Sequence, residues 1–179
     1  MNKIKKILYS TNSQKILDFL LSHPDEEFFD RQISKLTDIS KSGTNFALRE
    51  LAKANIIKRE KRGRMCFYKI EHNDILVKHL KIVQNITLLY PLLSKLKSIS
   101  LKIILYGSAA NGDNTMESDI DIFILSRQQK KTKNIIFKDS LREKIQYIIT
   151  APNDFAKLKK ENPVFYKEIL NGIPLWEQK

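Results

Sequence analysis

The first half of this chain of 179 residues has apolar positions spaced for helices. Apolar residues recur every three or four positions over 13–22 and 42–54, a period that predicts two amphipathic helices. A Ser13 hydroxyl is expected to cap the first helix, and a shorter helix beginning at Asp30 is expected between the two. Helices joined by a tight turn in this way form a helix-turn-helix.

The next segment, 56–70, has the composition of strands. Arg62-Gly63-Arg64 divides it, and glycine accepts the backbone angles of a hairpin tip, so we expect a β-hairpin. The part from Lys58 to Lys69 contains six basic residues and one acidic residue, a net charge of +5. The N-terminal half is therefore expected to end in a strongly basic hairpin.

Residues 72–97 form a connector with apolar residues at helical intervals. Pro91 is expected to end one helix or to start the next, since proline suits the first turn of a helix. The apolar face is wide enough for a homodimer interface, and equally suits a helix that only bridges two domains.

The second half changes to short apolar runs typical of strands. One run ends at Tyr106, a second follows Asp119, and 144–150 predicts a third strand. The polar segment 127–134 is expected to be a basic loop. Two helices are expected after Pro152 and Pro163, with the second ending at Gly172 and with Trp176 packed against the domain.

The chemistry of the second half lies between its first two runs. Gly107 allows the backbone to approach a ligand closely, and Ser108 offers a hydroxyl beside free backbone N–H groups. Asp119 and Asp121 lie two positions apart on a strand, so their carboxylates share one face, roughly 7 Å apart. Such a pair suits Mg²⁺ or Mn²⁺, with phosphate oxygens of a substrate completing the coordination.

Gly107-Ser108, ten further residues and then Asp119-Ile120-Asp121 resemble the fingerprint of the nucleotidyltransferase superfamily, in particular the minimal nucleotidyltransferases. The resemblance covers about 101–150. It implies that Gly107 and Ser108 bind the triphosphate of a nucleotide, and that Asp119 and Asp121 are catalytic metal ligands. It also implies an antitoxin role, in which a partner toxin of the helical HEPN type is modified.

The basic hairpin after a helix-turn-helix resembles the winged helix domains of prokaryotic transcriptional regulators. In that family the second helix enters the major groove and the wing contacts phosphate or the minor groove. The resemblance assigns these residues to DNA contacts: Lys41, Ser42, Thr44, Asn45, Arg49, Arg62 and Arg64. A winged helix that serves only for protein contacts remains the alternative.

A third carboxylate, usual on the third strand of active nucleotidyltransferases, is missing from the pattern. Gln146 occupies the matching position, while Glu143 and Asp139 precede the strand. A neutral amide binds a cation less well and cannot act as a general base near neutral pH. Nucleotide binding can thus be retained where transfer is slow.

Bulk properties narrow the class of partner. The net charge of +12 favours polyanions such as DNA or nucleotides. Cys66 is the single cysteine, which excludes an intrachain disulfide and fits a cytoplasmic location. No apolar run is long enough to cross a membrane, so no membrane partner is expected.

Together these patterns predict an α+β protein with a winged helix-turn-helix at 1–71, connector helices at 72–98 and a mixed-sheet nucleotidyltransferase domain at 99–179. The predicted function is Mg²⁺-dependent transfer of AMP from ATP to a protein or other hydroxyl acceptor. A DNA-binding regulator that only senses nucleotide is the alternative. Addition of nucleotides to RNA ends is a third, weaker reading.

Overall fold

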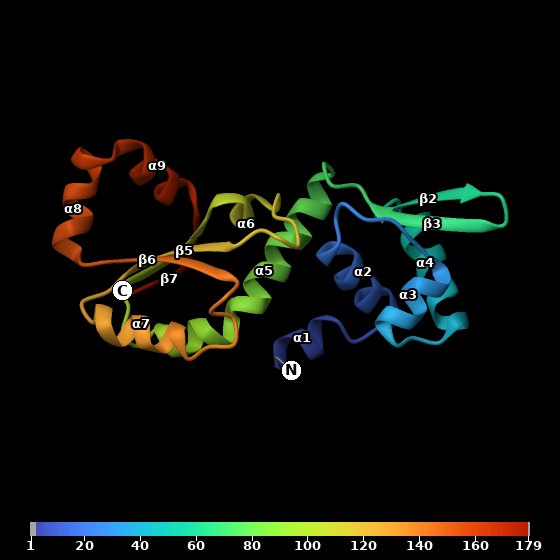
Figure 1. Ribbon diagram of the computed structural model, residues 1–179, viewed down its shortest axis with the longest axis horizontal. Coiled ribbons are helices and arrows are strands. Elements are labelled where there is room, and N and C mark those ends of the chain that lie inside the picture. Colours follow the sequence, from blue (N-terminus) through green and yellow to red (C-terminus); the bar gives the residue numbers. More distant parts are fainter. Residues whose placement is uncertain (1–2, 179) are drawn as a thin grey trace. The chain divides into compact units, whose positions relative to one another are not determined.

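The computed structural model describes residues 3–178 and divides into two compact units, residues 1–84 and residues 85–179. The division falls inside one long helix, α5 (Ile75–Leu96), within the predicted connector. Figure 1 labels the elements, and its colours follow the chain. As predicted, helices and two separate sheets make a mixed α+β protein.

Helices dominate the first unit. Its elements before α5 are α1 (Lys3–Leu8), α2 (Asn12–Ser22), β1 (Phe28–Phe29), α3 (Asp30–Thr37), α4 (Lys41–Lys53), β2 (Ile57–Arg62) and β3 (Met65–Ile70). The core joins the inward faces of α2, α3 and α4 through buried side chains such as Ile16, Ile33 and Leu48. Thr11, rather than the predicted Ser13, caps α2, because its hydroxyl accepts from the backbone N–H of Gln14.

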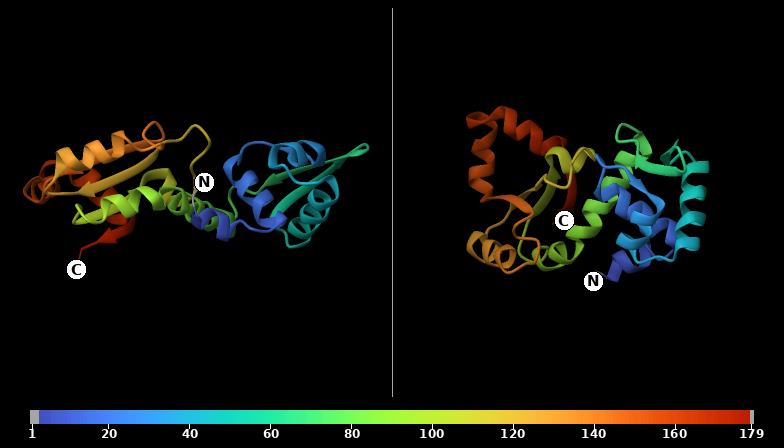
Figure 2. Two further views of the ribbon diagram at one scale, coloured as in Figure 1. Left: turned by 90° about the horizontal axis from the view of Figure 1, so that it is seen from below. Right: turned by 45° about the vertical axis from the view of Figure 1, so that its right-hand side comes forward.

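The hairpin of β2 and β3 is confirmed by its register. Arg62 pairs with Met65 at the tip, and Gly63 between them has a positive φ of 62°. The two-residue strand β1 adds to the other edge of β3, which gives the strand order β1-β3-β2. Figures 1 and 2 both show the hairpin extending beyond the helices of its unit.

A four-stranded sheet organises the second unit. Its elements after α5 are β4 (Lys102–Tyr106), α6 (Gly107–Asn111), β5 (Ile120–Leu125), α7 (Gln129–Phe137), β6 (Ile145–Thr150), α8 (Pro152–Glu161), α9 (Pro163–Asn171) and β7 (Ile173–Glu177). The strand order is β6-β5-β4-β7, with β5 and β6 parallel and the other pairs antiparallel. The strands β4, β5 and β6 were expected from their apolar runs, and the edge strand β7 was not.

Alternation along the strands gives the sheet two different faces. Ile103, Leu105 and Ile122 belong to a core cluster with buried residues of α5 and α7. Tyr106 and Phe123 point the other way, into a smaller cluster with residues of α8 and α9. Asp121 lies two positions before Phe123, so it belongs to the α8–α9 face.

Pro91 neither ends nor starts a helix, contrary to the prediction, because α5 continues through it. An internal proline removes a helical hydrogen bond and costs about 3 kcal/mol. Leu89, Leu92 and Leu96 are fully buried on either side of it. Each contributes roughly 1.5–3 kcal/mol on burial, which offsets the cost of the proline.

The prediction of a basic loop at 127–134 was also wrong, since α7 begins at Gln129 and continues to Phe137. Its anchor is tertiary: Ile136 is fully buried in the core, and the Thr132 hydroxyl donates to the Ser126 hydroxyl at 3.1 Å. Packing of two side chains outweighs the polar character of the segment.

The segment around Trp176 pairs with β4 as strand β7. The indole packs against the core cluster, as expected, and its N–H donates to the carbonyl of Ser100 at 3.3 Å. No helix within residues 3–178 has the length and apolar character to cross a membrane.

Candidate nucleotide and metal site

The turn from β4 to α6 is built around Gly107. Its φ of 66° lies in the left-handed region, where a side chain is unfavourable. A Cβ atom at this position would lie 2.5 Å from the Oδ2 atom of Asp121. Only glycine therefore allows the backbone at the start of α6 to approach this carboxylate. The half-buried Ser108 follows directly, as the second residue of the helix.

Asp119 and Asp121 stand at the start of β5. Asp119 is exposed and immediately precedes the strand, whereas Asp121 is half buried within it. Asp121 pairs with Tyr106 of β4 on one side and with Gln146 of β6 on the other. The structure therefore brings Gly107 beside Asp121 of a separate segment, and Asp119 lies near enough to Asp121 to raise its pKa.

Hydrogen bonds fix the loop between α6 and β5, and so the position of Asp119. The Asn85 amide of α5 donates to the carbonyl of Ala109 and to the side chain of Asn114, both at 2.9 Å. The Ser118 hydroxyl accepts from the backbone N–H of Thr115 at 2.9 Å. These hydrogen bonds of buried amide groups restrict the loop to one conformation.

The electrostatics of the site are those of crowded acids. Burial, and then the charges of Asp119 and Glu168, raise the pKa of Asp121 above its usual value. Burial, Asp121 and Glu168 raise the pKa of Tyr106 to about 12. All these influences oppose negative charge, so a cation placed between the carboxylates would relieve them.

Glu168 is the residue that the sequence did not reveal. It comes from α9, 47 positions after Asp121, and nothing in the spacing links the two. The fold brings it near, because Phe165 packs edge-on against Tyr106 at 5.8 Å and Ile169 is fully buried in the cluster on the same sheet face. The sequence offered one signal: Glu168 lies next to Ile169, an inward-facing residue of the helix that follows the last predicted strand.

The other candidates for a third carboxylate lie elsewhere. Gln146 is confirmed in register with Asp121, so an amide occupies the neighbouring strand position. Asp139 is buried and accepts from Lys95 at 2.7 Å, and Glu143 pairs with Arg142 at 3.1 Å. Both acids are engaged in other ion pairs.

The carboxylates of Asp119 and Asp121 fit a divalent cation whose other ligands are water and substrate phosphates. Across residues 3–178, no group of three or more His, Cys, Asp or Glu side chains is arranged to hold a metal ion. Mg²⁺ does not need one, since it is usually bound by one or two carboxylates together with water and substrate phosphates. Asp119 and Asp121 supply that minimum, and Mn²⁺ would suit the same oxygens.

The predicted DNA contacts divide into exposed and engaged residues. On α4, Lys41, Ser42 and Arg49 are exposed and Asn45 is half buried. Thr44 is fully buried, and its hydroxyl donates to the Ile39 carbonyl at 3.4 Å, so it belongs to the core of the unit.

The two wing arginines also differ. Arg64 is exposed in the hairpin turn. Arg62 donates to both carboxylate oxygens of Glu27 and of Glu60, and its guanidinium lies 4.8 Å from the centre of the Phe67 ring. The hydrogen bonds to Glu60 and Glu27 raise the pKa of Arg62 further, and the two carboxylates already balance its charge. Arg64 is therefore the wing cation that is better placed for a phosphate.

Comparison with known proteins addresses the second unit. The family described as "Polymerase beta, Nucleotidyltransferase" matches residues 88–179. Among solved structures, the crystal structure of a putative nucleotidyltransferase from Sulfolobus solfataricus is 15% identical with a TM-score of 0.38. That similarity covers 56% of this chain and 87% of the other. No curated protein matches the chain.

Proposed function

The chain belongs to the polymerase beta nucleotidyltransferase family, and on that premise we propose that it transfers a nucleoside monophosphate, AMP from ATP, to a hydroxyl group. One observation carries the proposal: the Gly107 backbone lies so close to Asp121 that a Cβ atom would be 2.5 Å from the carboxylate. A phosphate-binding turn and a metal-binding acid must lie that near each other to hold one triphosphate.

Each part of the site has a role in this reaction. Gly107 and Ser108 bind the triphosphate through backbone N–H groups and the hydroxyl. Asp119 and Asp121 would hold Mg²⁺ or Mn²⁺, which would neutralise phosphate charge and polarise the phosphoryl oxygens. The acceptor oxygen bonds to the α-phosphorus, the bond from that phosphorus to the bridging oxygen breaks, and pyrophosphate leaves.

The acceptor must also lose its hydroxyl proton. The Gln146 amide cannot take a proton near neutral pH. The charge of Glu168 raises the pKa of Asp121, and a carboxylate, unlike an amide, can accept a proton. We assign Glu168 the part of the third carboxylate, which accepts the proton directly or through a water molecule.

A protein acceptor is favoured by the resemblance to minimal nucleotidyltransferases. In that reading the chain is an antitoxin that modifies a HEPN-type toxin in the cytoplasm. ATP labelled at the α-phosphate, incubated with Mg²⁺ and a toxin from a neighbouring gene, tests this. Label on the toxin with wild-type protein and none with Asp119→Asn is the expected result. ATP binding without transfer to any acceptor would favour the nucleotide-sensing regulator, and labelled RNA ends would favour the third reading.

For the first unit we propose DNA binding by a winged helix. The supporting observation is the exposed basic side of α4 together with a basic hairpin that extends beyond the helices. Lys41, Arg49 and Arg64 would contact phosphates, and Ser42 and Asn45 the base edges. Gel-shift titration of a mixed-sequence duplex at several salt concentrations tests it, since phosphate contacts give affinity that falls steeply with salt. The same unit could instead form a homodimer, which sedimentation of the full chain would reveal.

A further inference from the structure

One large apolar side chain lies on the outward, solvent-exposed side of α4. Phe46, in the middle of the helix, is 66% exposed. The inward side of α4 is already complete, since Ala47 and Leu48 are fully buried and Leu51 is nearly so. A single exposed apolar side chain is ordinary on a protein surface, so the significance of Phe46 depends on what surrounds it.

The surroundings of Phe46 are polar and basic. Ser42, Phe46, Arg49 and Lys53 follow at intervals of four, three and four residues, so they lie along one face of α4. The acid beside them, Glu50, is held at the flank by a 2.9 Å hydrogen bond from the Ser13 hydroxyl of α2. On this face of α4, the phenyl group therefore has Arg49 and Lys53 within two helical turns. The neighbouring acid, Glu50, is engaged at the flank.

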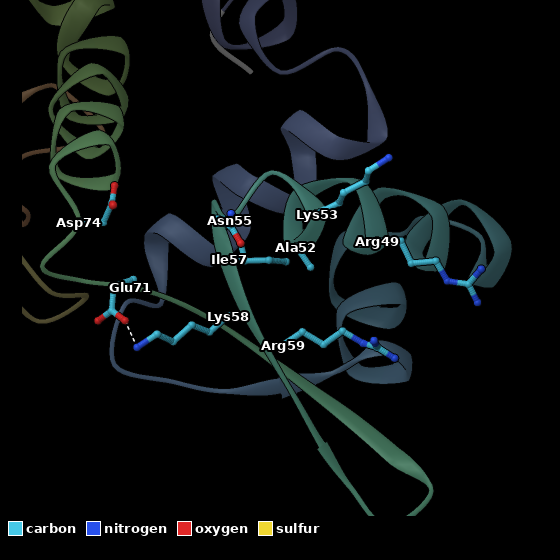
Figure 3. A pocket seen from close by; sticks show the side chains of 9 residues that line it. All are labelled: Arg49, Ala52, Lys53, Asn55, Ile57, Lys58, Arg59, Glu71 and Asp74. Atoms are coloured by element: carbon cyan, nitrogen blue, oxygen red, sulfur yellow. Dashed lines mark ion pairs between the residues drawn. The ribbon is translucent and has the colours of Figure 1, made fainter.

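The positive charge continues from α4 onto the hairpin. Arg49 and Arg59 line a hollow of about 620 Å³ between the end of α4 and β2. Figure 3 shows Lys58 directed to Glu71, while the two guanidinium groups extend away from that pair. The second acid of the lining, Asp74, accepts from the backbone N–H of Leu76 at 2.8 Å. Both acids are thus engaged. Arg49, Lys53 and Arg59 remain as positive charge in the lining, and the Arg59 guanidinium also donates to the Cys66 Sγ atom at 3.1 Å.

We propose that α4 lies in the major groove of DNA and that Phe46 reads the methyl groups of thymine there. This rests on the DNA binding proposed for the first unit and adds the base that it prefers. The 5-methyl group of thymine is the apolar feature of the major groove, and phenylalanine is among the side chains that contact it. Phosphates flank the groove, where Arg49 and Arg59 would meet them. An apolar protein partner would match the phenyl group but not the cations on the same face of α4 and on the adjoining hairpin.

The test uses full-length protein and duplexes selected from a random-sequence pool at low salt. In the best duplex, each thymine is replaced in turn by deoxyuridine, which lacks only the methyl group. At one or two positions wild-type binding should weaken by about fourfold per replacement, the effect of one buried methyl group. Phe46→Ala should bind the thymine duplex several-fold more weakly and lose the distinction between the two bases. Val164→Ala, which removes a 77% exposed side chain from the second unit, should behave as wild type.

Each other outcome overturns the inference in a recognisable way. Sequence-specific binding in which no deoxyuridine replacement has an effect, or in which Phe46→Ala keeps the wild-type ratio, would exclude methyl readout but leave DNA binding intact. Absence of any salt-dependent DNA binding by the wild type would remove the proposed DNA binding and this reading with it. A change in the sedimentation of Phe46→Ala, with unchanged DNA affinity, would assign the phenyl group to a contact between copies of the chain. Circular dichroism establishes that the variant is folded.

Discussion

The Cα atom of Gly107 faces the Asp121 carboxylate so closely that a single added carbon would lie 2.5 Å from its Oδ2 atom. A separation under 3 Å cannot persist, so either the turn or the acid would have to move. Strand pairing fixes the backbone of Asp121 but not its carboxylate, so relief of the contact requires either rotation of that carboxylate or movement of the turn, and both separate the two groups.

Gly107→Ala is therefore expected to abolish Mg²⁺-dependent nucleotide binding and to lower the free energy of unfolding. The positive φ alone costs about 1–2 kcal/mol for alanine, and the contact with Asp121 adds to it. Gly63→Ala is the matched control, since Gly63 has a similar φ of 62° but nothing within 4 Å of an added Cβ. Urea titration and calorimetry with ATP measure both effects. Equal behaviour of the two variants would show that the approach to Asp121 does not matter.

Asp121→Asn is expected to separate function from stability. The folded pKa of Asp121 is raised, so the ionised carboxylate costs stability above that pKa, and the cost disappears as pH falls below the unfolded value. The amide should therefore increase the thermal midpoint at pH 7 while removing metal-dependent nucleotide binding. The stability gain should shrink on acidification. Asp25→Asn, at an exposed acid of the first unit, should leave both properties unchanged. A midpoint lowered by Asp121→Asn would contradict the crowding of acids.

Glu168 and Gln146 can be tested as a pair. Glu168→Gln should slow nucleotide transfer by roughly 10²–10⁴-fold, the usual contribution of a general base, with a smaller effect on ATP affinity. Gln146→Glu, next to Asp121 on the same sheet face, should restore part of the rate in the Glu168→Gln background. Gln129→Glu on α7 adds the same charge away from the site. A Glu168→Gln rate equal to wild type would exclude the role assigned to Glu168.

The ion pair of Asp139 with Lys95 is expected to be structural. Burial raises the pKa of Asp139, but the hydrogen bond from Lys95 and the backbone N–H groups outweigh it and leave the pKa lowered. A lowered pKa gives stability that is present above the unfolded value and lost as pH falls through the folded one. Asp139→Asn should cost about 1–2 kcal/mol of unfolding free energy at pH 7 and little at pH 2. Glu143→Gln, in an exposed pair, should change it by less than about 0.5 kcal/mol. A loss that persists at pH 2 would point to packing instead.

Local signals predicted much of this fold and part of its site. The hairpin followed from Gly63 between two strand-like runs. Gly107, Asp119 and Asp121 could be proposed as site residues because they lie close together in sequence around one turn and one strand. Glu168 was not found, since only the packing of α9 on the sheet brings it near Asp121. The continuation of α5 through Pro91 and the helix at 129–137 were missed for a related reason. Buried leucines in one case and Ile136 in the other decide the structure, and neither contact is visible in the local pattern.

The central claim is that Asp119 and Asp121 hold a divalent cation for a nucleotide bound at Gly107 and Ser108. Isothermal titration of the full chain with ATP, with Mg²⁺ and with EDTA, tests it most directly. The account predicts binding that requires Mg²⁺ in the wild type and disappears in both Asp119→Asn and Asp121→Asn. Binding of equal strength in EDTA, or binding that both variants retain, would contradict it.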